Sequence, residues 1–120
     1  MLIHDFYLIK KDDLDFDNLK IWIIDKEKIL YGIKISDDYI LENASCFGKS
    51  AKFSSSFRKQ LEHRIEKGLS YYGTTVLYGE DITDFLTALL ELPDCNEKEM
   101  LLKIARLAIE KGYCIVHFGV

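Results

Sequence analysis

The chain has 120 residues, of which 48% are hydrophobic and 30% charged, and its formal net charge is −4 at pH 7. This length and composition predict one globular domain, residues 1–120, that is large enough for a hydrophobic core. The acidic balance argues against general binding to nucleic acids or anionic membranes. One proline and seven glycines, with no low-complexity run, argue against a long linker or a disordered tail.

Two further features indicate the compartment. The apolar N-terminal stretch contains Asp5 and has no basic region or small-residue cleavage site, and no segment approaches the ~18 apolar residues of a transmembrane helix. Cys46, Cys95 and Cys114 are odd in number and far apart, which is typical of reduced thiols. We therefore expect a cytoplasmic protein that does not enter the membrane.

The first part of the chain predicts strands. Residues 2–9 are rich in aromatic and branched side chains, and a short polar turn joins two further apolar runs, 19–25 and 29–35, as an antiparallel hairpin. After another polar turn, residues 39–42 predict a strand and residues 43–53 predict a loop.

The middle of the chain predicts two helices around a strand. Serines that can cap a helix and a narrow apolar stripe predict a surface helix over residues 56–67 whose buried edge is formed by Phe57, Leu61 and Ile65. Residues 74–78 predict a short strand. Asp81 is the expected cap of the next helix, which Pro93 ends, and its inward-facing side chains are expected to be Ile82, Phe85, Leu86, Leu89 and Leu90.

The C-terminal segment predicts a capped, largely buried helix followed by a strand. Asn96 is the expected N-cap, Gly112 the expected left-handed stop, and residues 113–118 are apolar at nearly every position. The order of elements predicts an α+β fold. We expect a mainly antiparallel sheet of about five or six strands, three helices packed largely on one face, and the C-terminal strand inside the sheet.

Alternation of side chains along the strands predicts which residues face the helices. It assigns Cys114, Val116 and Phe118 to the helix-covered face and Tyr113, Ile115 and His117 to the opposite face. The opposite face then carries an aromatic patch of the kind that binds a partner, formed by Tyr7, Trp22, Tyr113 and His117.

Two sequence motifs lack the context that their chemistry requires. Gly48-Lys49-Ser50 resembles the end of a Walker A loop, but Asn43 stands where the first glycine belongs and the nucleotide fold needs a parallel sheet. The aspartates at 12–17 resemble a calcium loop, but the glycine and glutamate of an EF-hand are missing. A metal site and a cofactor are therefore not expected.

The spacing of the cysteines, histidines and serines in the sequence does not predict a catalytic site. Cys114 and His117 are three residues apart on one strand and point to opposite faces, and His4 can approach His117 only if the first and last strands pair. The serine run 54–56 has no Gly-x-Ser-x-Gly elbow. We expect a protein that is not an enzyme.

In size, net acidity, compact α+β patterning and an Ile/Lys/Asp/Tyr-rich composition, the whole chain resembles the small immunity proteins of bacterial toxin–immunity systems, including contact-dependent growth inhibition. This resemblance implies a tight complex with one cognate toxin domain, frequently a nuclease. The complex would block the toxin at its active site or at an adjacent surface. On charge grounds a nucleic-acid partner is not expected, no membrane partner is expected, and a homo-oligomer is left open.

The candidate partner-binding residues follow from charge and aromatic character. Acidic side chains speed association with a basic partner, and a buried aromatic anchor sets the residence time. The acidic candidates are Asp12, Asp13, Asp15 and Asp17, Trp22 is the expected anchor, and Tyr7 and His117 are added from the aromatic face. Glu80, Asp81 and Asp84 form a second acidic set. The alternative is a small nucleotide-binding or nucleic-acid-binding regulatory protein that uses the basic segment 49–67.

Overall fold

The computed structural model describes residues 2–13, 26–59 and 62–120 of the chain. The predicted strand at 19–25 and the candidate residues Asp15, Asp17 and Trp22 lie outside the described residues.

A six-stranded antiparallel sheet is the centre of the fold, and its strand order is β2-β1-β6-β5-β3-β4. The strands are β1 (Ile3–Lys10), β2 (Tyr31–Ser36), β3 (Ser54–Lys59), β4 (Glu62–Lys67), β5 (Thr74–Leu77) and β6 (Tyr113–Phe118). The C-terminal strand β6 lies between β1 and β5, as predicted. Its apolar sequence suits this interior position because both of its faces are covered.

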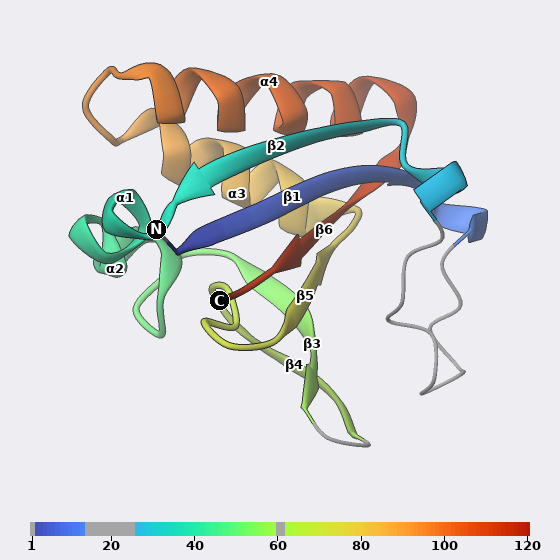
Figure 1. Ribbon diagram of the computed structural model, residues 1–120, viewed down its shortest axis with the longest axis horizontal. Coiled ribbons are helices and arrows are strands. Elements are labelled where there is room, and N and C mark those ends of the chain that lie inside the picture. The colour runs from blue at the N-terminus through green and yellow to red at the C-terminus, as the bar shows by residue number, and fades with distance from the viewer. Residues whose placement is uncertain (1, 14–25, 60–61) are drawn as a thin grey trace.

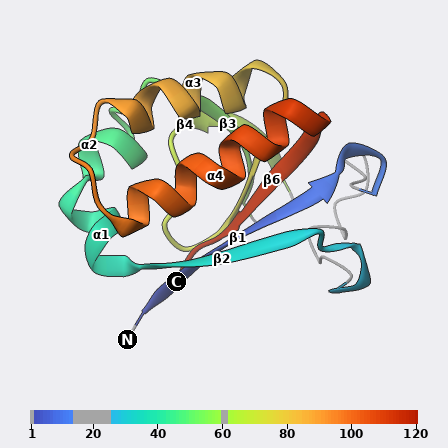
Figure 2. The same cartoon turned by 90° about the horizontal axis from the view of Figure 1, so that it is seen from above.

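The described residues form four α-helices beside the sheet: α1 (Asp37–Glu42), α2 (Ala44–Phe47), α3 (Glu80–Leu90) and α4 (Asn96–Lys111). The two long helices, α3 and α4, lie across one face of the sheet, and the short helices α1 and α2 lie at one end of it (Figures 1 and 2). The α+β prediction is confirmed, with one more helix than expected. None of the helices formed by the described residues has the length and apolar character needed to cross a lipid bilayer.

The main core lies between the sheet and the two long helices. Its fully enclosed side chains come from both layers and include Phe6, Ile35, Leu77, Phe85, Leu89, Leu101, Ile104 and Ile115. The helix α4 ends where it was predicted to end, because Gly112 takes the left-handed conformation (φ 69°) and its N–H bonds to Ala108 O.

The predicted assignment of the sheet faces is wrong. Ile115 belongs to the core under the helices, and Tyr113 packs against that core. Cys114 and Val116 form a separate cluster on the other face, against which Phe118 packs. Because β6 is apolar at nearly every position, its alternation does not distinguish the two faces.

Two predicted elements have the other secondary structure. Residues 39–42 belong to α1 and not to a strand, because Ser36 Oγ accepts the Tyr39 N–H (3.4 Å) and caps a helix that begins with two aspartates. Residues 56–59 and 62–67 belong to the paired strands β3 and β4, which we name the β3–β4 hairpin, and not to a helix. The pairing of β3 with β5 overrides the local helical pattern, and Ile65, expected to be buried, is 73% exposed.

Three smaller expectations are corrected at the helix ends. The N-cap of α3 is Gly79 and not Asp81, and the N-cap of α4 is Cys95 and not Asn96. Neither N-cap has a side-chain hydrogen bond. In α3, Leu90 is exposed although the apolar pattern placed it inward.

Candidate functional site

The short helix α1 carries the side chains that gather at one end of the sheet. It is held at both ends: Asp37 N–H donates to Leu2 O (3.0 Å), and Asn43 Nδ2–H donates to Tyr39 O (2.9 Å). Ile40 is buried in the core, whereas Asp38, Leu41 and Glu42 are exposed. The helix therefore presents a fixed outer face to solvent.

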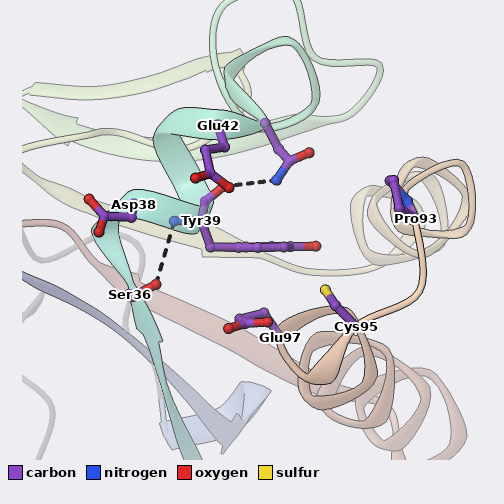
Figure 3. A pocket seen from close by; sticks show the side chains of 8 residues that line it. Ser36, Asp38, Tyr39, Glu42, Pro93, Cys95 and Glu97 are labelled. Atoms are coloured by element: carbon purple, nitrogen blue, oxygen red, sulfur yellow. Dashed lines mark hydrogen bonds between the residues drawn. The ribbon is translucent and has the colours of Figure 1, made fainter.

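A pocket of about 540 Å³ lies between α1 and the segment that leads into α4. Figure 3 shows the Tyr39 ring extending from α1 toward Pro93 and Cys95, with Glu42 and Glu97 on either side of it, whereas Asp38 lines the pocket from the other side of the α1 backbone. Within the described part of the chain, none of these three carboxylates forms an ion pair, whereas nearby Asp94 is bonded to Lys98 (2.8 Å). The pocket therefore combines unpaired negative charge with an aromatic wall.

The Tyr39 hydroxyl is buried and forms no hydrogen bond with any described residue. Burial is the main cause that raises its pKa, and the neighbouring Cys95 adds to the effect. A thiol is only a weak hydrogen-bonding group, so it does not compensate for the lost water contacts. This hydroxyl is an incompletely satisfied polar group at the wall of the pocket.

The other flank of α1 is apolar and exposed. Leu2 is 57%, Leu41 52% and Tyr72 82% exposed. The Tyr72 ring packs edge-on against Tyr71 (4.7 Å between centroids), and Tyr71 and Leu41 both line a smaller cavity of about 80 Å³ beside His4. We name the whole region the α1 surface, and it consists of Leu2, Asp38, Tyr39, Leu41, Glu42, Tyr71, Tyr72 and Glu97.

A buried polar network lies directly beneath the α1 surface. His4 Nε2 is 2.9 Å from Asp37 Oδ1, and His4 Nδ1 is 2.8 Å from His117 Nε2. Tyr71 Oη donates to Asp37 Oδ2 (2.7 Å), and His117 Nδ1 is 3.2 Å from Thr75 Oγ1. We name this group the His–Asp network: His4, Asp37, Tyr71, Thr75 and His117.

The first and last strands, β1 and β6, pair with each other, and this pairing brings His4 and His117 together as expected. Phe6 is opposite His117, so His4 lies on the same face one step along β1. The imidazoles bond directly to each other and are 0% exposed. Among the described residues no group of three or more potential ligands could hold a metal ion.

The ionisation of the His–Asp network follows from its contacts. Burial lowers the pKa of His117 to about 3, and the nearby His4 adds to this shift. The hydrogen bond from His4 lowers the pKa of Asp37, with a further contribution from Tyr71. The hydrogen bond to Asp37 raises the pKa of Tyr71 to about 12. Every ring nitrogen of the two histidines has a partner inside the protein, so neither is free to take a proton from a substrate.

The described members of the predicted partner site lie outside the α1 surface. Asp12 and Asp13 are exposed on the 3₁₀ turn η1 (Lys11–Asp13), and Asp13 is 3.7 Å from Lys28 Nζ. Tyr7 is half-buried on the face away from α3 and α4, where its ring contacts Phe118. His117 was predicted to contact a partner, but this is wrong because the side chain is fully buried.

The remaining candidates also lie outside the α1 surface. Gly48-Lys49-Ser50 connects α2 to β3, so it does not form the strand–loop–helix arrangement of a Walker A loop. Glu80, Asp81 and Asp84 lie at the start of α3, where burial and its two acidic neighbours raise the pKa of Asp81.

Comparison of the chain with protein-family models, with curated protein sequences and with solved structures found no match. The α1 surface is therefore the feature from which we infer a function.

Proposed function

We propose that the protein neutralises a cognate bacterial toxin domain by binding it tightly through the α1 surface. The observation that supports this is the joint display, on one short and fixed helix, of unpaired carboxylates and exposed apolar side chains. Interfaces of high affinity combine aromatic or aliphatic anchors with charges that complement the partner.

The charge of the pocket selects a basic partner. Glu42 and Glu97 flank the Tyr39 ring, Asp38 lines the same pocket, and the pocket leaves room for a lysine or arginine side chain. An arginine can pair with carboxylates in two-point geometry and stack on an aromatic ring. A nuclease toxin presents such side chains because it must bind phosphates.

The apolar flank of α1 supplies the buried contact area that keeps the toxin domain bound for a long time. Tyr72 and Leu41 are exposed side by side with Tyr71, and Leu2 is joined to α1 through Asp37. Exposed aromatic side chains at the centre of a patch are the usual hot spots of an interface. The acidic turn at Asp12 and Asp13 is a second acidic surface, and it provides an internal comparison.

The proposal is tested first by the gene neighbourhood and then by binding. A toxin C-terminal domain encoded immediately upstream is expected, and a metabolic operon in that place counts against the proposal. Co-expression of the protein with that toxin domain should restore growth. Removal of the anchor in Tyr72→Ala should abolish this rescue, because the exposed ring loses its contact with the toxin.

Association kinetics then locate the site. Reversal of charge in Asp38→Lys/Glu42→Lys should slow association with the toxin domain by about tenfold at low salt, and high salt should reduce this difference. The matched control is Asp12→Lys/Asp13→Lys, which changes the net charge equally and should alter the rate by less than about threefold. Equal effects of the two double variants contradict the assignment to the α1 surface.

A further inference from the structure

The hydrogen bonds of the His–Asp network assign its protons. The Asp37 carboxylate accepts from Tyr71 and from His4 Nε2–H, so His4 Nδ1 is left as an acceptor when the ring is neutral. His117 Nε2–H then donates to His4 Nδ1, and the Thr75 hydroxyl donates to His117 Nδ1. Thr75 Oγ1 in turn accepts the Ser70 N–H (2.8 Å).

This arrangement accommodates one added proton but not two. With one proton, His4 donates from both nitrogens, and His117 accepts at Nε2 and donates from Nδ1 toward Thr75. With two protons, His4 and His117 direct N–H groups at each other across 2.8 Å, so their hydrogen bond is lost and the two positive charges repel. Because both rings are 0% exposed, water cannot relieve this repulsion without movement of the chain.

The network connects the α1 surface to the sheet. His4, Thr75 and His117 belong to the neighbouring strands β1, β5 and β6, whereas Asp37 is the first residue of α1. Tyr71 belongs to the connection between β4 and β5 that also carries Tyr72. If Asp37 separates from His4, α1 and the Tyr71–Tyr72 segment lose the same anchor.

We propose that the His–Asp network is a proton-sensitive clamp that holds α1 on the sheet and releases it when both imidazoles are protonated. The clamp regulates the α1 surface, and this role rests on the proposed function. Acid conditions then convert a fixed binding surface into a mobile one and weaken the complex.

The groups that face the two imidazoles make the clamp respond to acid. Within the described part of the chain, Asp37 faces His4 from α1, and Tyr71 faces His4 from the β4–β5 connection. Asp38 and Tyr72 act on Tyr71, and the remaining neighbours, Phe6 and Thr75, are uncharged. One carboxylate thus compensates one imidazolium, and no described cation approaches the pair.

The clamp is tested on the free protein by hydrogen exchange between about pH 7.5 and about pH 5, with protection factors corrected for intrinsic rates. The reporters are the amides of Asp37 and Asn43, whose hydrogen bonds hold the ends of α1, and the reference is the Gly112 amide at the end of α4. Below pH 6.5, protection at the reporters should fall by up to about tenfold per pH unit for each proton taken up on opening. Exchange at the reference amide requires only fraying at the end of α4, which exposes neither imidazole, so this amide should keep its protection.

Two variants give the clamp a matched comparison. His117→Gln removes the second imidazole, so it should abolish most of the pH dependence at Asp37 and Asn43. His63→Gln changes the remaining histidine of the chain, on the edge strand β4, and should leave the pH dependence as it is. Constant protection in the native protein, or an unchanged pH dependence in His117→Gln, contradicts the clamp.

A second measurement decides the matter if His117→Gln does not fold. The ¹⁵N shifts of His117 in the native protein should remain those of a neutral imidazole at every pH at which α1 is mainly closed. Titration of His117 near pH 6.5 without opening of α1 contradicts the clamp. No toxin is needed for either experiment, so a failure of the clamp is distinct from a failure of toxin binding, which the association kinetics report.

Discussion

The Tyr39 hydroxyl allows a test in which one substitution has opposite effects at two positions. Tyr39→Phe removes a hydroxyl that is buried without a described hydrogen-bond partner. Tyr71→Phe removes a hydroxyl that donates to Asp37 at 2.7 Å. The same atom is deleted in both variants, and only its bonding differs.

The expected magnitude at Tyr39 follows from the cost of an unsatisfied polar group. Burial of a hydroxyl without a partner costs about 1–3 kcal/mol, and the low end applies because the nearby Cys95 thiol compensates weakly. Tyr39→Phe should therefore raise the free energy of unfolding by about 1 kcal/mol. With a typical urea m value this raises the midpoint by about 0.5 M. Tyr71→Phe should lower the midpoint, because Asp37 loses a hydrogen bond.

Urea denaturation followed by circular dichroism measures both effects, provided that the m value is unchanged. A decrease in the midpoint of Tyr39→Phe would show that its hydroxyl has a good hydrogen-bond partner and would refute the description of the pocket wall. An unchanged midpoint of Tyr71→Phe would refute the contribution of the His–Asp network. In the toxin complex Tyr39→Phe keeps the ring, so we expect an affinity within about threefold of the native value.

Three further predictions test the remaining structural claims. Burial lowers the pKa of His117 to about 3, so below pH 6.5 the unfolded chain binds a proton that the folded chain does not bind. The free energy of unfolding should therefore fall by about 2 kcal/mol from pH 7.5 to pH 5, as measured by urea denaturation. Gly68→Ala should cost about 3 kcal/mol of stability, because φ is +75° and the added Cβ meets backbone oxygens of residues 47 and 48. Gly79→Ala (φ +61°) has open space and should cost only about 1 kcal/mol. Addition of ATP or GTP should leave the melting temperature unchanged, whereas a saturable increase that Lys49→Ala removes would support the nucleotide-binding alternative.

Long elements with a strong local pattern could be predicted from the sequence. The segment from Asn96 to Phe118 forms the helix and interior strand that its pattern indicates, because α4 has a wide apolar surface and Gly112 provides an unambiguous stop. The α+β class follows from the same kind of evidence. In this segment local preference and tertiary packing favour the same structure.

Short segments could not be predicted because neighbours decided their structure. Residues 39–42 have strand-forming side chains, but the cap at Ser36 starts a helix at Asp37 that includes them. In the β3–β4 hairpin the apolar spacing resembles a helix, yet Ser56 pairs with Val76 of β5, and Ile65 stays exposed. Pairing with a strand that is distant in sequence leaves no local signal.

The candidate site illustrates this limit most clearly. The hydrogen-bonded partners in the His–Asp network are separated by 33 to 113 positions along the chain, and the antiparallel pairing of β1 with β6 makes the two histidines neighbours. The sequence carried a conditional signal, since His4 and His117 become adjacent if these strands pair. It carried no signal for Asp37, because the segment that begins there was expected to be a turn before a strand.

The corrected position of His117 changes its role and not its relevance. On the predicted open face it would contact a partner directly. In the structure it is enclosed beneath α1, so it can affect a partner only by fixing His4 and, through His4, Asp37. The side chains that reach solvent at this end of the sheet are Asp38, Leu41, Glu42 and Tyr72, which have no motif and are unremarkable in the sequence. A binding surface of this kind is defined by the element that presents it, and the terminal strands contribute the buried contacts that keep this element in place.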